Sequence, residues 1–147
     1  MSRITTIALA AVVSIALSAT LALASGGKPA IQLHSEGKFG KVLVARNGYT
    51  IYAFDKDKRN KDACQSIHAC LSAWPVVKPG AVLAGPGVDK SLIGTITLKS
   101  GTKQLTYAGH ALYTYAGDAE PHETTYINYN QFGARWPAVS AAGKLVK

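Results

Sequence analysis

The sequence predicts a mainly β protein in which two tandem hairpin or meander repeats pack as one small domain, with a short helical turn near the cysteines. Turn signals separate short runs rich in β-branched and aromatic residues, which favour strands. Each copy is too small to bury a sufficient core alone, so the two copies are expected to share one. A shift of 61 or 62 residues superimposes the copies at Tyr52 and Tyr113, Asp57 and Asp118, and Trp74-Pro75 and Trp136-Pro137.

Residues 1–24 have the layout of a secretory signal peptide. Arg3 precedes 21 residues without charge, and Ala22-Leu23-Ala24 fits a cleavage site with small residues. An uncleaved membrane anchor is the alternative, because about 20 uncharged residues can span a bilayer. Cleavage predicts a periplasmic or extracellular protein with no transmembrane segment. No cysteine lies near the cleavage site to accept a lipid.

The charge balance favours anionic partners. The whole chain has a net charge of +8, and loss of Arg3 leaves 15 basic and 8 acidic residues, or +7. The densest basic run covers 56–61. We expect a partner that is an anionic envelope component or another envelope protein. The alternative is a soluble protein that its charge keeps monomeric, and a monomer is expected. No nucleic-acid partner is expected, because the chain is exported and carries no such motif.

The first repeat is expected over 38–79, after an N-terminal lead-in at 25–37. Strands at 42–44 and 49–54 flank Asn47-Gly48, a two-residue turn that needs positive φ. One or two helical turns are expected within 62–73. Pro75 then fixes an extended exit, because the residue before a proline avoids the helical region.

The second repeat is expected over 99–145, after residues 80–98 that form a linker and the first strand of a meander. Turns around Ser100-Gly101-Thr102 and at Ala108-Gly109 join strands at 92–98, 103–107 and 111–115. The polar stretch 124–135 is interpreted as a loop.

A signature Tyr-x-aromatic-x-x-Asp recurs in both copies. Residues i and i+2 of a strand share a face, so Tyr52 with Phe54, and Tyr113 with Tyr115, form aromatic pairs. Such pairs belong to a core more often than to a ligand platform. Each aspartate follows its strand, where a carboxylate accepts backbone N–H groups of a turn. Asp57 and Asp118 are therefore interpreted as structural, with a binding role as the alternative, and Trp74 and Trp136 as core anchors.

Two cysteines in an exported chain predict a disulfide between Cys64 and Cys70. The alternative is a metal-binding or redox site formed by Cys64, His68 and Cys70, because thiolates and imidazoles bind soft transition metals. A fourth ligand is missing nearby, and no cofactor is expected. A second group, more typical of a solvated loop, consists of His110, Glu120, His122 and Glu123.

The repeated motif, the Cys…Cys-x-x-x-Trp-Pro segment and the duplication resemble the secreted-repeat family of predicted bacterial lipoproteins that carry a Tyr-x-(Phe/Trp/Tyr)-x-x-Asp motif. The resemblance covers about 38–145. It implies export and a repeat architecture, and it supplies no catalytic residues, since the family has no known biochemical function. The missing lipid-acceptor cysteine is a departure that puts membrane tethering in doubt.

These observations predict a non-enzymatic binding or interaction module of the bacterial cell envelope. The chain lacks the hydrolase elbow, the zinc-protease helix and the phosphate loop. The expected contact surface consists of basic loops and four tyrosines interpreted as half-exposed, namely Tyr49, Tyr107, Tyr126 and Tyr129.

Overall fold

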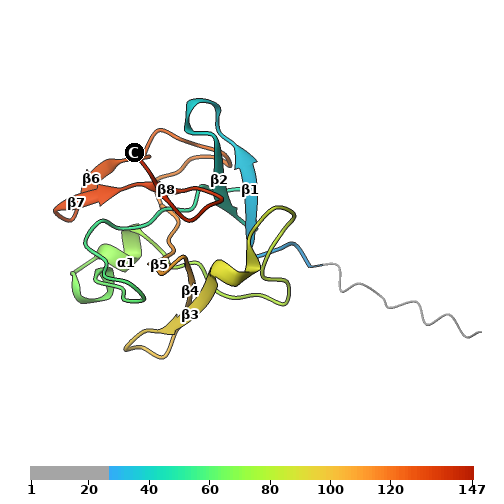
Figure 1. The fold of residues 1–147 in the computed structure, drawn as a ribbon. Helices are drawn as coiled ribbons and strands as arrows, with labels where there is room; N and C mark the ends of the chain where they lie inside the picture. The colour runs from blue at the N-terminus through green and yellow to red at the C-terminus, as the bar shows by residue number, and fades with distance from the viewer. Residues whose placement is uncertain (1–26) are drawn as a thin grey trace, which may run out of the picture.

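A computed structural model describes residues 27–147, so the predicted signal peptide at 1–24 lies outside the described residues (Figure 1). The described part is mainly β, which confirms the predicted class. Its strands are β1 (Ile31–Ser35), β2 (Lys41–Ala45), β3 (Ile93–Thr97), β4 (Lys103–Tyr107), β5 (His110–Ala111), β6 (Tyr129–Gln131), β7 (Ala134–Trp136), β8 (Ala138–Val139) and β9 (Leu145–Val146).

Helix is confined to single turns in the described residues, and none is long enough to cross a membrane. The expected helical turns near the cysteines are confirmed as η2 and α1. The helical elements are η1 (Gly37–Phe39), η2 (Cys64–Ser66), α1 (Cys70–Ala73) and η3 (Lys90–Leu92).

The lead-in contains a strand that the sequence analysis did not predict. β1 pairs antiparallel with β2, from Ile31 opposite Ala45 to Ser35 opposite Lys41. Ile31 is fully buried and Leu33 packs against the same core, as the alternation of a strand requires. The residues before the first repeat are therefore part of the folded domain.

The Asn47-Gly48 prediction is wrong in turn type. The Ala45 N–H donates to Tyr49 O, and of the two turn residues only Gly48 has positive φ, at 87°. This is a three-residue loop with glycine in the left-handed region. The segment 49–54 then makes isolated bridges instead of a continuous strand.

The predicted meander of the second repeat is confirmed as the sheet β3-β4-β5. A two-residue turn at Ala108-Gly109, with φ of 51° and 85°, joins β4 to β5. The loop predicted at 124–135 is wrong in part, because β6 and β7 form a hairpin there. Both central residues of its turn, Phe132 and Gly133, have positive φ. β6 is largely exposed, so it lacks the apolar alternation that marks a strand in sequence.

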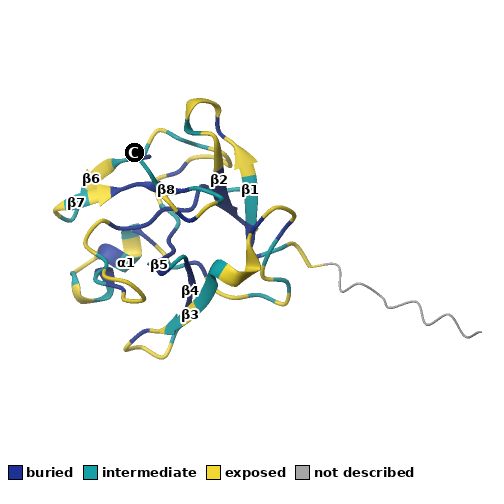
Figure 2. Ribbon diagram, in the orientation of Figure 1, coloured by how far each residue is buried: buried dark blue, intermediate teal, exposed yellow. Residues whose placement is uncertain are grey.

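The two repeats are interlocked through their central strands. Tyr52 and Tyr113 exchange backbone hydrogen bonds of 2.8 and 2.9 Å. Tyr52 also bridges to Ala138, and Tyr113 to Val76, so each central strand pairs with the segment that follows Trp-Pro in the other repeat. Figure 2 shows these buried segments at the centre of the molecule. The buried hydrophobic residues form two clusters that each contain residues of both copies, so the copies share their core, as predicted.

Candidate functional site

Four aromatic rings form a continuous stack across the boundary between the repeats. Their order is Phe54, Trp136, Trp74 and Tyr115, with successive ring centroids 4.1, 3.9 and 4.2 Å apart. The two indoles are fully buried and lie within 3° of parallel. The aromatic residue of each motif thus stacks on the tryptophan of the other repeat. A single residue of β6, Gln131, accepts both indole N–H groups, at 2.8 and 3.1 Å.

The tyrosine of each motif donates to the aspartate of the other copy. Tyr113 Oη donates to Asp57 Oδ2 at 2.8 Å, and Tyr52 Oη donates to Asp118 Oδ1 at 3.1 Å. Asp57 Oδ1 also accepts the turn N–H of Ala63 at 2.7 Å. The motif residues therefore form two crossed pairs that join the repeats.

Burial makes the motif carboxyls hard to ionise. Burial, with a smaller contribution from the neighbouring charge of Asp62, raises the pKa of Asp57 to about 7. Burial and the charge of Glu123 raise the pKa of Asp118 to about 6. Burial also raises the pKa of Tyr52 and Tyr113 far above the usual range, so both phenols stay protonated donors.

The prolines of the two Trp-Pro segments fix the strands that frame these pairs. Pro137 O accepts from Ala53 N and Pro75 O accepts from Thr114 N, both at 2.9 Å. Every group of this cluster lies in or beside the core, and each motif side chain has a partner inside the protein. The crossed pairs thus connect the two repeats inside the folded domain.

The disulfide between Cys64 and Cys70 is confirmed. It joins η2 to α1, with both cysteines fully buried. Because the sulfurs are bonded to each other, the alternative metal site of Cys64, His68 and Cys70 has no thiolates in this structure. His68 is exposed beside them.

The second group, interpreted from the sequence as a solvated loop, does not form a metal-ligating cluster in the part of the chain that the structure describes. Among residues 27–147, the one cluster of three metal-ligating side chains consists of His34, Glu36 and His122. His122 therefore meets two residues of the lead-in, which the sequence analysis did not consider. Glu123, by contrast, accepts the backbone N–H of Ala119 at 2.8 Å.

The four tyrosines predicted as a contact surface differ in their exposure to solvent. Tyr107 is fully buried, so its assignment as half-exposed is wrong, and its hydroxyl donates to Ala141 O at 2.8 Å. Tyr126 and Tyr129 cluster with Tyr115 at the outer end of the aromatic stack. Tyr49 is half-buried beside the first hairpin turn.

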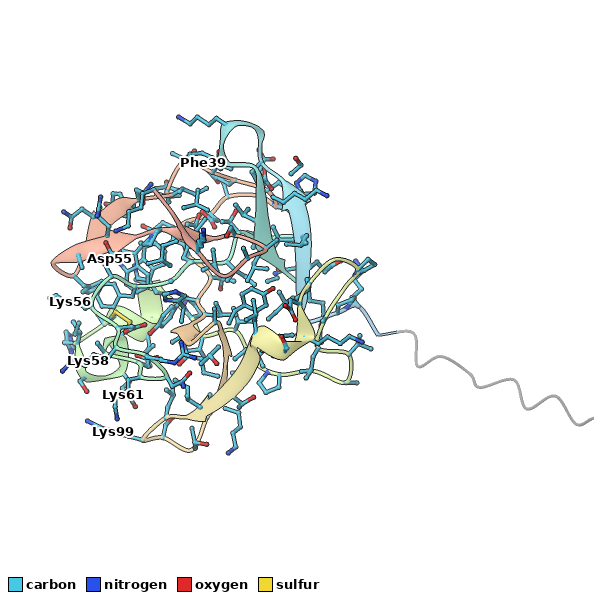
Figure 3. All side chains as sticks on the ribbon, in the orientation of Figure 1. Phe39, Asp55, Lys56, Lys58, Lys61 and Lys99 are labelled. Atoms are coloured by element: carbon cyan, nitrogen blue, oxygen red, sulfur yellow. A yellow bond between two sulfur atoms is a disulfide. The ribbon has the colours of Figure 1, made fainter. Side chains whose placement is uncertain are left out.

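The loop 55–62 sorts its charges between inside and outside. Asp62 is 5% exposed, and the carboxylate of Asp57 turns to Tyr113. Asp55 stays at the surface, where it pairs with Arg135 and Lys147. Figure 3 shows the lysines of this loop on one side of the molecule, followed by the tip of the β3–β4 hairpin. We call this set the basic edge, which consists of Lys56, Lys58, Lys61 and Lys99.

The comparisons with known proteins identify a family and no closer relative. A family described as a secreted repeat of unknown function matches residues 34–78 and 94–140, which is more than half of the chain. No curated protein and no solved structure matches. The two matched segments contain the crossed Tyr–Asp pairs and both Trp-Pro segments. The chain belongs to this family of secreted repeats of unknown function.

Proposed function

We propose that the protein is a non-enzymatic binding module that docks a phosphate-bearing surface of the cell envelope through its basic edge. The observation that carries this proposal is the sorting of charge in the loop 55–62. The sequence there holds four basic and three acidic residues and looks nearly balanced. The fold buries Asp62, turns Asp57 inward and leaves Asp55 at the surface in ion pairs outside this loop, so the outer face is mainly cationic.

The four lysines of the basic edge make no ion pair with the described residues. Among the described residues, the ion pairs of lysine and arginine are those of Arg135 and Lys147 with Asp55. All four lysines of the basic edge are exposed. Their ammonium groups therefore add their fields, which attract a multivalent anion better than a single one.

Both repeats hold the basic edge in place. The Lys99 N–H donates to Gln65 Oε1 at 2.9 Å, and Lys99 Nζ donates to Ser66 Oγ at 3.2 Å. Lys56 Nζ donates to Phe132 O at 2.9 Å. These contacts fix the two outer lysines relative to the disulfide-linked segment between them. A phosphate-rich lipid or polymer surface presents several anions to these lysines at once.

Replacing all four lysines of the basic edge by glutamine should lower the affinity for vesicles that contain phosphatidylglycerol by about a hundredfold or more. Each lysine near an anionic membrane surface contributes about 1 kcal/mol. Binding is measured by co-sedimentation at several salt concentrations, and the variant should also show a weaker salt dependence. A parallel titration with soluble polyphosphate distinguishes a lipid source of phosphate from a polymer.

The matched control replaces four exposed lysines elsewhere, namely Lys38, Lys41, Lys90 and Lys144. This variant has the same net charge as the first. It should retain most of the affinity, because the lost charges lie outside the basic edge. Equal losses in both variants would mean that only net charge matters, and unchanged binding in the first would place the partner on another surface.

A further inference from the structure

We propose that His34, Glu36 and His122 form a binding site for a divalent late transition metal such as Zn²⁺. His34 is on β1, and Glu36 is the first residue after that strand. His122 is on the loop that follows Asp118, the motif aspartate of the second repeat. Two imidazoles and one carboxylate are a ligand set that suits zinc and its neighbours in the first transition series, and it leaves coordination positions open.

The spacing of the three ligand atoms fits one ion. Glu36 Oε1 lies 2.8 Å from His34 Nδ1 and 3.2 Å from His122 Nδ1. All three ligand atoms lie within 4.8 Å of one another. Two ligands that each bind zinc at about 2.1 Å with angles of about 90–110° lie about 3.0–3.4 Å apart. The contact of His122 lies within this range, whereas that of His34 is a hydrogen bond that must lengthen by about 0.2 Å when an ion binds. The imidazoles are also stacked, with centroids 3.7 Å apart. Both Nδ1 atoms contact the same carboxylate oxygen.

The backbone around the cluster holds the ligands before an ion arrives. The Glu36 N–H donates to Gly40 O at 2.9 Å, which closes the turn beside β1. The His122 N–H donates to Gly48 O at 3.0 Å. At Gly48, which has a φ of 87°, a Cβ would come within 3.0 Å of Pro121. The close approach of the two loops therefore depends on that glycine.

The fold itself does not require this cluster. The duplicated position shows the same backbone contact, in which Asn60 N–H donates to Gly109 O at 2.8 Å. At an offset of 61 residues, Thr95 and Thr97 stand where the first copy has His34 and Glu36. The second position thus joins loop to turn without any imidazole or carboxylate from these residues. The backbone contact therefore forms whether or not histidines and a glutamate surround it.

The cluster combines a buried carboxylate with accessible imidazoles. The side chain of Glu36 is 7% exposed, whereas those of His34 and His122 are 46% and 39% exposed. The imidazoles line a surface hollow of about 360 Å³, which Lys28 and Arg46 also line. An ion can therefore enter from solvent, and the open coordination positions face a basic hollow that suits a small anion as an additional ligand.

The test titrates Zn²⁺ into the untagged mature protein by calorimetry. Four histidines occur in the chain, two in the cluster and two outside it, so His68→Ala and His110→Ala are matched controls. We expect one equivalent of Zn²⁺ for the wild type and both controls. His34→Ala and His122→Ala should each bind Zn²⁺ at least about a hundredfold more weakly. Loss of a residue that only hydrogen-bonds to a metal ligand already lowers metal affinity by about 10–100-fold. Mg²⁺ should not compete.

Thermal melting separates a lost site from a lost fold. Each variant should keep its melting temperature without metal, and Zn²⁺ should raise that of the wild type and the controls only. Glu36→Gln should also weaken binding, since the amide carries no charge. The proposal is overturned if His34→Ala and His122→Ala bind Zn²⁺ like the wild type, or if the four histidine variants lose binding equally.

Discussion

Replacing Trp74 or Trp136 by alanine should lower the free energy of unfolding by about 3–5 kcal/mol. Each indole is fully buried and stacks on the other at 3.9 Å. Each also makes a perpendicular contact with the ring of a motif tyrosine, with centroids 5.2 Å apart in both cases. Removal of either ring therefore leaves a cavity and exposes the ring of its partner. Chemical denaturation followed by circular dichroism measures the change.

The double variant tests whether the stack acts as one unit. Because the indoles share a face, the two single losses should not add, and their coupling should be about 0.5–1.5 kcal/mol. Tyr129→Ala is the control, since its side chain is large and aromatic but 42% exposed. It should cost less than about 1 kcal/mol. Tryptophan variants as stable as this control would show that the repeats do not depend on the stack.

The duplication made the fold class predictable. The hydrogen bonds between residues of different copies could not be predicted. The motif places Tyr52 and Asp57 five residues apart, so sequence reasoning treats them as one local unit. In the structure, their hydrogen-bond partners lie 66 and 56 residues away. Spacing within one copy contains no information about which copy supplies the partner. Only the small size of each repeat indicated that the two had to cooperate.

The local errors have similar physical causes. Asn47-Gly48 is a strong signal for a two-residue turn, but of this turn and the one predicted at Ala108-Gly109 only the latter has two residues with positive φ. There Ala108 accepts a positive φ of 51°, which alanine rarely adopts, because the pairing of β4 with β5 requires it. Tertiary pairing overrides local preference in this case. The strand β1 was missed because the first repeat was expected to begin at Lys38, whereas the family match begins at residue 34 and β1 corresponds to β3 of the second repeat.

The metal-ligating cluster could not be predicted from the sequence for a related reason. Glu36 and His122 are 86 residues apart, and neither belongs to the repeated motif. The sequence did place His122 among candidate ligands, but it grouped that residue with its chain neighbours. The disulfide was predictable, in contrast, because export and two nearby cysteines suffice to indicate it. What sequence reasoning missed was the contact between segments of different repeats.

The stability of the protein should fall as the pH rises from about 4 to about 8. In the unfolded chain an aspartate titrates near 3.9, whereas in the folded protein the pKa is about 7 for Asp57 and about 6 for Asp118. Between these values the native state binds more protons than the unfolded state, so the free energy of unfolding decreases with pH. The contribution is complete below about pH 4. It is lost as the pH passes the folded pKa of each group.

Asparagine variants isolate this contribution, because an amide cannot ionise. At Asp57 the amide keeps one accepting oxygen for the Ala63 N–H, and its NH₂ group donates to the Tyr113 hydroxyl, as a protonated carboxyl would. After allowance for solvent screening, Asp57 accounts for about 2–4 kcal/mol of the fall. Asp57→Asn should therefore be more stable than the wild type at pH 8 and lose that advantage at pH 4. Asp118→Asn should show the same change, but its advantage should begin at a lower pH, because the folded pKa of Asp118 is lower. Denaturation midpoints across this range give the result.

Asp89→Asn is the control for the pH experiment. This aspartate is exposed, and hydrogen bonds from Ser91 lower its pKa, which is the opposite shift. Its replacement should leave the fall between pH 4 and 8 intact. Some slope should remain even without Asp57 and Asp118, since burial also raises the pKa of Asp62. A wild-type stability that rises over this range would mean that the crossed Tyr–Asp pairs hold ionised carboxylates, and the asparagine variants would then be less stable at pH 8.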